Sequence, residues 1–142
     1  MMSNLERAKK IFSEGAYTCV ICSDSDIQTS NQRGVAPLLK WLDEKEDLSG
    51  YSVADKVVGK GASFLYILLG VSEVYAEVIS IPAYDTLKKY GIPVTYKTMT
   101  EAVRNRDNTG FCPIETAVME IETPEKALTA IRNKLEEMKN KR

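Results

Sequence analysis

The segment from Ser52 to Gly70 constrains the fold more than any other, because most of its side chains are apolar. Ser52 and Asp55 are typical of a helix start, and Gly70 is typical of a helix end. The expected helix is apolar on most sides instead of along one stripe, which predicts that it is buried. Gly59 and Gly61 have no side chains, so another backbone can approach this part of the helix closely.

Helix and strand patterns alternate along the rest of the chain. The expected helices span residues 4–13, 34–44, 82–91, 100–104 and 124–139, and one more begins after Cys112. The expected strands span residues 17–22, 27–30, 73–80 and 94–97. Alternation of this kind predicts one α/β domain over residues 1–142, with a mixed sheet that is flanked by helices.

The chain of 142 residues is long enough for one sizeable core. Its 19 basic and 20 acidic residues give a net charge of −1, so no strong field of either sign is available to hold nucleic acid or a membrane surface. The longest apolar run, Phe64 to Val71, is too short to span a bilayer. Residues 1–14 carry charges and lack the apolar core of a signal peptide, so we expect a cytoplasmic protein.

The chain contains no histidine and three cysteines. The absence of histidine excludes Ser–His, Cys–His and histidine–zinc chemistry within this chain, and leaves acid–base work to Asp, Glu, Lys, Cys or Tyr. Cys19 and Cys22 form a Cys-x-x-Cys pair, but residues three apart in a strand point to opposite faces. We therefore expect both sulfurs in the core, in a protein of a reducing compartment.

Cys112 is the sharpest candidate for chemistry. Pro113 fits the first position of a helix, where a missing N–H is harmless, so Cys112 is the expected N-cap. Unpaired backbone N–H groups and the positive end of the helix dipole favour the thiolate form there. The functional interpretation is a nucleophile, a redox thiol or a persulfide carrier, and the structural one is a small capping residue. Glu115 is either a general acid or base or an ordinary partner of the helix dipole.

The loop before this helix consists of polar and turn-forming residues: Asn105, Arg106, Asp107, Asn108, Thr109 and Gly110. Such a loop can direct several N–H groups toward one point, which suits a phosphate or a carboxylate. Arg33 and Arg106 could pair with the same anion. The alternative is a plain turn between two helices, because these residue types favour Asx turns and positive φ.

Asp55, Lys56, Gly59 and Lys60 form a second candidate. In the expected helix, Lys56 and Lys60 share one face by the i, i+4 rule. Charges in an otherwise apolar helix need a partner or a pocket. The sequence Val-Gly-Lys-Gly lacks the spacing of a P-loop. Close packing of Gly59 and Gly61 against the sheet is the structural alternative.

Four segments carry a resemblance to a known family: residues 33–38, 54–60, 74–80 and 105–115. With them the chain resembles an uncharacterised family of small bacterial and archaeal proteins, a domain of unknown function grouped with the cytidine deaminase-like superfamily. The resemblance implies the three-layer cytidine deaminase-like fold, an α/β fold with a mixed sheet flanked by helices. It carries no assigned reaction.

Deaminases of that superfamily hold zinc through a His/Cys-x-Glu motif and a Pro-Cys-x-x-Cys motif, each at a helix start. By the order of elements, the second motif falls on residues 82–86, where Ala83 and Thr86 take the cysteine positions. The first motif falls near Asp55, again without histidine. We therefore expect no metal and no cofactor, and the substrate class of nucleobases and nucleotides remains an analogy.

We expect the site where residues 55–60 meet residues 107–115. Cys112 would be the reacting thiol, and Asp55 and Glu115 would move protons. Lys56 or Lys60 would favour the thiolate or neutralise an anion. The expected ligand is a small molecule, anionic or nucleotide-like.

Two further hypotheses stay open on the sequence alone. One is a non-catalytic ligand-binding or regulatory domain that uses the same pocket, with Cys112 only as a cap. The other is a structural partner protein, a homodimer formed through Trp41 or the last helix. The sequence does not decide whether the protein is an enzyme.

Overall fold

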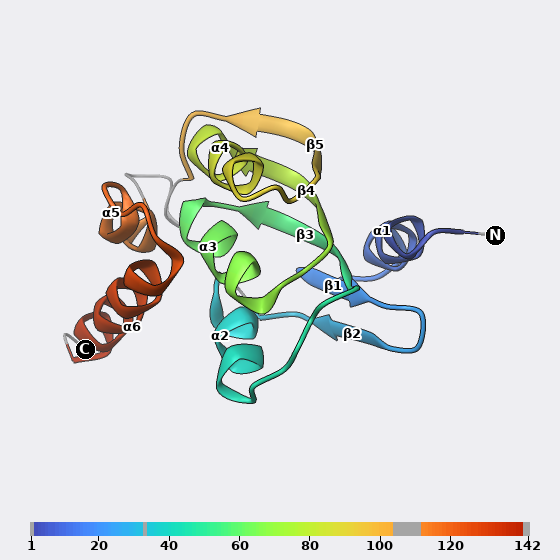
Figure 1. The fold of residues 1–142 in the computed structure, drawn as a ribbon, viewed down its shortest axis with the longest axis horizontal. Helices are drawn as coiled ribbons and strands as arrows, with labels where there is room; N and C mark the ends of the chain where they lie inside the picture. Colours follow the sequence, from blue (N-terminus) through green and yellow to red (C-terminus); the bar gives the residue numbers. More distant parts are fainter. Residues whose placement is uncertain (1, 33, 104–111, 141–142) are drawn as a thin grey trace.

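The computed structural model describes residues 2–32, 34–103 and 112–140, which form one five-stranded sheet with helices on both faces (Figure 1). The strands are β1 (Cys19–Cys22), β2 (Ile27–Ser30), β3 (Ser52–Val58), β4 (Glu73–Ser80) and β5 (Val94–Thr100). The helices are α1 (Asn4–Glu14), α2 (Ala36–Asp43), α3 (Lys60–Leu69), α4 (Ile81–Lys89), α5 (Pro113–Val118) and α6 (Pro124–Asn140). No helix within these three ranges has the length and apolar character needed to cross a lipid bilayer.

The sheet is mixed, with strand order β2-β1-β3-β4-β5. β1 runs antiparallel to both β2 and β3, whereas β3, β4 and β5 are parallel to one another. α3 connects β3 to β4 and α4 connects β4 to β5, since parallel neighbours require a crossover. The predicted α/β class and mixed sheet are confirmed, and the carboxyl ends of three strands meet at one edge.

The helices form layers around the sheet (Figure 1). α1 packs on one face, against β1, β3 and β4. α2, α3 and α4 cover the opposite face, and α5 and α6 pack against the outer side of α3. α3 is the central helix, and its Phe64, Leu65 and Tyr66 side chains are at most 1% exposed. The predicted burial of this helix is confirmed.

The two faces of the sheet have separate cores. Cys19 and Ile21 belong to the large core under α3, and Val20 and Cys22 belong to a small core under α1. The two sulfurs of the Cys-x-x-Cys pair therefore lie on opposite faces of β1, and both are buried, as the sequence predicts.

Capping residues set helix ends at the predicted places. The Ser3 hydroxyl accepts the N–H of Glu6 and the Glu6 carboxylate accepts the N–H of Ser3, which completes a capping box at the start of α1. Gly70 ends α3 with a φ of 79°, a left-handed conformation that favours glycine. These ends depend on neighbours in the chain, which is why local sequence predicts them.

The prediction of one helix over residues 52–70 is wrong in its first half, because residues 52–58 form β3. A strand inside a sheet is covered on both faces and reads as a continuous apolar run, so periodicity does not distinguish it from a buried helix. The β-branched Val53, Val57 and Val58 favour the strand.

Gly59 separates β3 from α3. Its φ of −98° and ψ of 178° are extended, and it is the N-cap of α3. Lys56 lies on the strand and Lys60 on the helix, so the prediction that both lysines share one helix face is wrong. The helix expected over 100–104 is also wrong for the described residues: the Thr-rich strand β5 continues to residue 100, and a bend follows it.

Leu65→Ala tests the central role of α3. The Leu65 side chain is 0% exposed, and truncation of a buried leucine costs about 2–5 kcal/mol. We expect urea unfolding to show a loss of free energy of unfolding in this range. Met119→Ala, at a side chain that is 56% exposed, is the control and should change that free energy by less than about 0.5 kcal/mol. Equal effects of the two substitutions would contradict the central position of α3.

Candidate functional site

A cavity of about 1350 Å³ opens at the carboxyl end of β3, lined by residues of β1, β3, α2, α5 and α6. We call it the β3 cavity. Its lining includes five residues that the sequence predicts for the site: Asp55, Lys56, Gly59, Cys112 and Glu115. Arg33 and the predicted ligand-binding residues 105–110 lie outside the described residues. The structure thus brings the strand before α3 together with the start of α5.

Asp55 is the most deeply buried charged group of this cavity, with 8% of its surface exposed. The Tyr66 hydroxyl donates to Oδ2 at 2.5 Å, and the Val57 N–H donates to Oδ1 at 3.3 Å. Burial raises the pKa of Asp55 to about 7, although these hydrogen bonds act in the opposite direction. Within the described ranges, no lysine or arginine forms an ion pair with Asp55.

Cys19, Tyr66 and Asp55 form a buried series of hydrogen bonds. Cys19 lies directly opposite Asp55 in the antiparallel pair of β1 and β3, and its Sγ is 3.3 Å from the Tyr66 hydroxyl oxygen. Burial raises the pKa of both the Cys19 thiol and the Tyr66 hydroxyl, so both are neutral near pH 7. When Asp55 is ionised, Tyr66 donates to it and can accept from the Cys19 thiol. No local sequence pattern indicates Tyr66 as a site residue, because only strand pairing and the packing of α3 bring it to Asp55.

Glu115 occupies the N-terminus of α3. Its Oε1 accepts the Lys60 N–H at 2.6 Å, and its Oε2 accepts the Gly61 N–H at 2.9 Å. Gly59, the N-cap, has no side chain to cap the helix, and a Cβ there would lie 2.5 Å from the carboxyl carbon of Glu115. Burial raises the pKa of Glu115, and the two N–H groups counteract this. A carboxylate of the protein thus fills the site at which a helix would bind an external anion.

Lys60 lies outside the lining of the β3 cavity, and its side chain reaches the end of α5. Its Nζ donates to the Met119 carbonyl oxygen at 2.8 Å, where a helix C-terminus favours a cation. Lys60 and Glu115 therefore join α3 to both ends of α5. This contact gives Lys60 a packing role in addition to the charge for which the sequence singles it out.

Cys112 is the N-cap of α5 and Pro113 is its first residue, as predicted. The Cys112 N–H donates to the Val103 carbonyl oxygen at 3.1 Å, and its carbonyl oxygen accepts the Thr116 N–H at 3.0 Å. Its thiol makes no capping hydrogen bond. Of the three cysteines, Cys112 is the one that is partly exposed, and it lines the β3 cavity.

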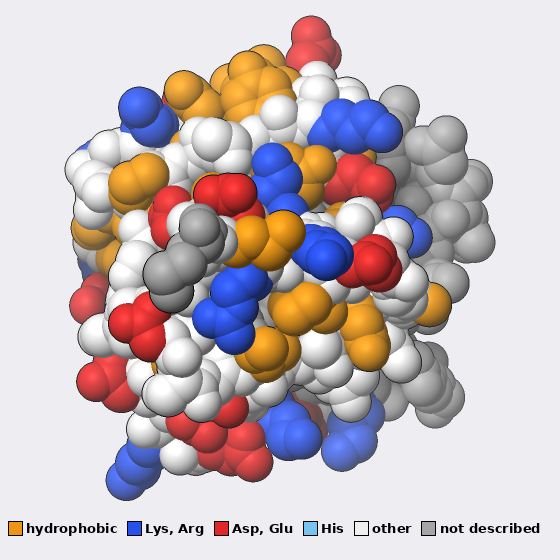
Figure 2. Space-filling model, turned by 90° about the vertical axis from the view of Figure 1, so that its right-hand side faces the viewer, with side chains coloured by type: hydrophobic (Ala, Val, Ile, Leu, Met, Phe, Trp, Pro, Cys, Tyr) orange, Lys and Arg blue, Asp and Glu red, His pale blue; other side chains and the backbone are white. Residues whose placement is uncertain are grey.

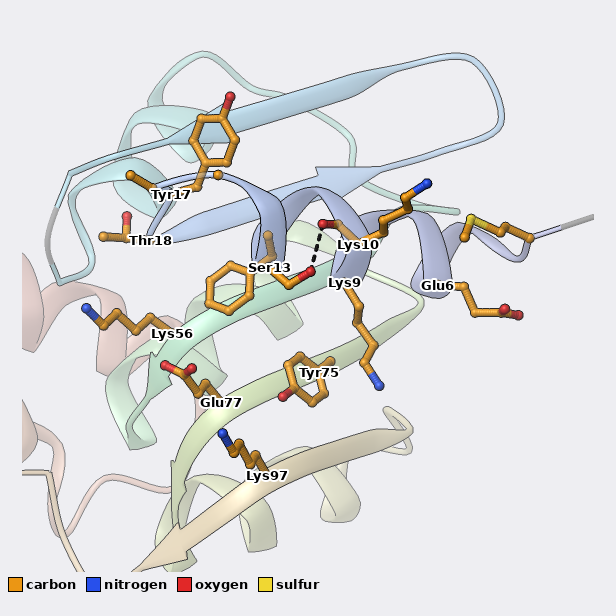
Figure 3. Close-up of a pocket in the computed structure, with 14 residues that line it drawn as sticks. Glu6, Lys9, Lys10, Ser13, Tyr17, Thr18, Lys56, Tyr75, Glu77 and Lys97 are labelled. Atoms are coloured by element: carbon orange, nitrogen blue, oxygen red, sulfur yellow. Dashed lines mark hydrogen bonds between the residues drawn. The ribbon is translucent and has the colours of Figure 1, made fainter.

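A second hollow, of about 890 Å³, lies beside α1 on the other face of the sheet (Figure 3). Lys9, Lys10, Lys56 and Lys97 line it, and all four are exposed. Figure 3 shows Glu77 of β4 between Lys56 of β3 and Lys97 of β5. On this side of the molecule, basic side chains lie among hydrophobic ones (Figure 2). These lysines are solvated, whereas Asp55 is buried, so the β3 cavity is the stronger candidate.

Both the sequence and the fold of this chain are similar to those of known proteins. Residues 7–135 match the family model described as "TM1506: Domain of unknown function (DUF1893)". The chain belongs to the DUF1893 family. It is similar to the crystal structure of a DUF1893 family protein (TM1506) from Thermotoga maritima, with 30% sequence identity and a TM-score of 0.84 over 96% of this chain and 92% of that one. A search of curated proteins gives no match. This DUF1893 protein therefore shares its fold with a solved relative, and the family description assigns no function.

Asp55→Asn tests the buried carboxyl group of this DUF1893 protein. The pKa of Asp55 is raised to about 7 in the fold, against about 4 in an unfolded chain. Between these values the folded state holds a proton that the unfolded state has released, so wild-type stability falls as pH rises from about 4 to about 7. Asn does not ionise. As pH rises through this window, the free energy of unfolding of the variant minus that of wild type should increase by up to about 1.4 kcal/mol per pH unit.

Urea unfolding of both proteins at several pH values from about 4 to about 8 measures this difference. A difference that stays constant across the window would contradict a raised pKa for Asp55.

Gly59→Ala and Glu115→Ala, made singly and together, test the cap of α3. The extended backbone at residue 59 suits any residue, so the cost of Gly59→Ala comes from the clash with Glu115. We expect a loss of about 1–3 kcal/mol in wild type and a much smaller loss in the Glu115→Ala background. Glu115→Ala alone should cost about 1–2 kcal/mol, as the loss of a helix cap does. Additive losses in urea unfolding would rule out this contact.

Proposed function

We propose that this DUF1893 protein binds a small polar molecule in the β3 cavity and that Cys112 lies where it can react with the bound molecule. The observation that carries the proposal is the Asp55 carboxyl group, which is almost fully buried and lines a cavity large enough for such a ligand. Burial of an ionisable group costs free energy, so a cavity that contains one is a candidate site. Concave sites with a few directed polar groups are typical of small-molecule binding.

The other groups of the β3 cavity fit this function. Lys40 and Lys139 are exposed residues of its lining, and their ammonium groups suit the anionic part of a ligand. Lys56 also lines the β3 cavity, but its side chain extends into the hollow beside α1 (Figure 3). The ligand that we propose is nucleotide-like, because such a molecule combines a ring that carries hydrogen-bond donors with a phosphate. The N-terminus of α3 does not supply the phosphate site, since Glu115 occupies it.

Cys112 is proposed as the reacting thiol because it is partly exposed and lines the same cavity as Asp55. Addition of the Cys112 sulfur to the carbon of a C=N double bond in the ligand ring would form an S–C bond and break the π bond. The π electron pair would pass to the ring nitrogen, which would take up the proton released by the thiol, directly or through water. The alternative is a non-catalytic binding or regulatory domain, in which Cys112 only caps α5. Trp41 gives no support to a homodimer, because it is 5% exposed and its Nε1 donates to Gln28 at 3.0 Å.

The placement in the cytidine deaminase-like superfamily is also a proposal. The mixed sheet between helical layers supports it. Ala83 and Thr86 lie near the start of α4, directly after β4, where the resemblance puts the second zinc motif. Asp55 lies on β3 instead of at a helix start. In this proposal Asp55 contacts the small molecule in the cavity and does not serve as a metal ligand.

Alkylation tests the reactive thiol. Iodoacetamide near neutral pH should add one group to the folded protein, at Cys112, because Cys19 and Cys22 are 2% and 0% exposed. Cys112→Ser should abolish the addition. Intact mass and peptide mapping measure it. Slow reaction of all three thiols would contradict Cys112-dependent chemistry.

Thermal unfolding with cytosine, adenine, CMP and AMP tests binding. A ligand at about 100 times its Kd adds about 2.7 kcal/mol to the stability of the folded state and raises its Tm. We expect a rise for at least one compound in wild type and its loss in Asp55→Asn. A rise that persists in Cys112→Ala would support the non-catalytic alternative, and no rise for any compound would contradict the proposed function.

A further inference from the structure

Asp55 and Glu115 both line the β3 cavity and each accepts two hydrogen bonds, but the longest of these four bonds is at Oδ1 of Asp55. Both oxygens of Glu115 are held by backbone N–H groups, at 2.6 and 2.9 Å. In Asp55, Oδ2 is held by the Tyr66 hydroxyl at 2.5 Å, whereas Oδ1 has the Val57 N–H at the longer distance of 3.3 Å. A carboxylate can accept about four hydrogen bonds. Oδ1 of Asp55 is therefore the atom with room for a donor from a ligand.

The second feature is the positive charge that would balance the ionised carboxylate of Asp55. No ion pair joins Asp55 to a lysine or arginine anywhere in the described ranges. The lysines that line the cavity are exposed, and Lys56, the neighbour of Asp55 on β3, also lines the hollow beside α1 on the opposite face (Figure 3). The hydroxyl of Tyr66 and the thiol of Cys19 supply dipoles but no positive charge. A ligand cation would compensate the carboxylate, and an anion beside it would be repelled.

We infer that the end of the ligand bound at Asp55 carries a cationic or amidine-type nitrogen, with N–H groups that donate to Oδ1. This inference rests on the proposed function and names the chemical class that the buried end of the β3 cavity recognises. Tyr66 is a positioning residue: it fixes Oδ2 and leaves Oδ1 for the ligand. Cys19 supports Tyr66 from β1.

Benzamidine and benzoate form a matched pair of probes, similar in shape and opposite in charge. At pH 8 wild type should bind benzamidine and not benzoate in isothermal titration calorimetry. Because Asp55 must be ionised, benzamidine affinity should fall about 30-fold between pH 8 and pH 5.5 for a carboxyl group with a pKa of about 7. Asp55→Asn should remove the binding at both pH values, and circular dichroism checks that the variant is folded.

Tyr66→Phe separates positioning from simple packing. This variant keeps the ring in the core and removes the hydrogen bond that stabilises the ionised carboxyl group. It should still bind benzamidine at high pH, with the midpoint of the pH dependence shifted upward. Lys88→Ala, on α4 and outside the lining of the β3 cavity, removes a charge as the control and should leave both affinity and midpoint unchanged.

Benzoate binding as tight as that of benzamidine, benzamidine affinity that does not change in Asp55→Asn, or no binding of benzamidine would each overturn the inference. If Asp55→Asn does not fold, an unshifted midpoint in Tyr66→Phe overturns it instead. A nucleotide that raises the Tm of wild type while benzamidine does not bind would overturn the inference and leave the proposed function standing. Failure of every compound would remove both.

Discussion

The carboxylate of Glu115 at the N-terminus of α3 is the interaction on which the site depends. A helix start carries unpaired N–H groups and partial positive charge, and Glu115 satisfies the N–H groups of Lys60 and Gly61 from 55 and 54 residues further along the chain. Lys60 in turn donates to the carbonyl oxygen at the end of α5. These contacts fix α5 against α3, and they thereby place Cys112 beside the carboxyl end of β3.

The contact between Glu115 and the N-terminus of α3 also affects which charged groups of the β3 cavity are available to a ligand. Because the protein supplies its own anion to α3, the helix offers no site for a phosphate. Asp55, in contrast, has a hydroxyl group as its partner and no cation in the described part of the chain. A buried carboxylate in that state favours a positively charged or strongly donating group. In the binding mode that we propose, the donor end of the ligand would therefore lie inside the cavity and its anionic end near the exposed lysines.

Sequence patterns predicted the elements whose signals are local. The helix α1, the strand β4 and the proline at the start of α5 were each predicted from residues within one turn or one strand. The prediction of β3 failed because a strand buried on both faces has no alternation, and the strand and helix around Gly59 then read as one apolar segment. For the candidate site, Cys112 was predicted from Pro113, whereas Tyr66 was missed.

The sequence by itself determined the α/β class, the opposite faces of Cys19 and Cys22, the N-cap position of Cys112 and the lack of histidine chemistry. Only the tertiary structure decided that Tyr66 and Cys19 meet at Asp55 and that Glu115 caps α3. The physical reason is that these contacts join residues 11, 47 and 55 positions apart. They depend on the register of β1 against β3 and on the packing of α5 against α3, which no local pattern of side chains encodes.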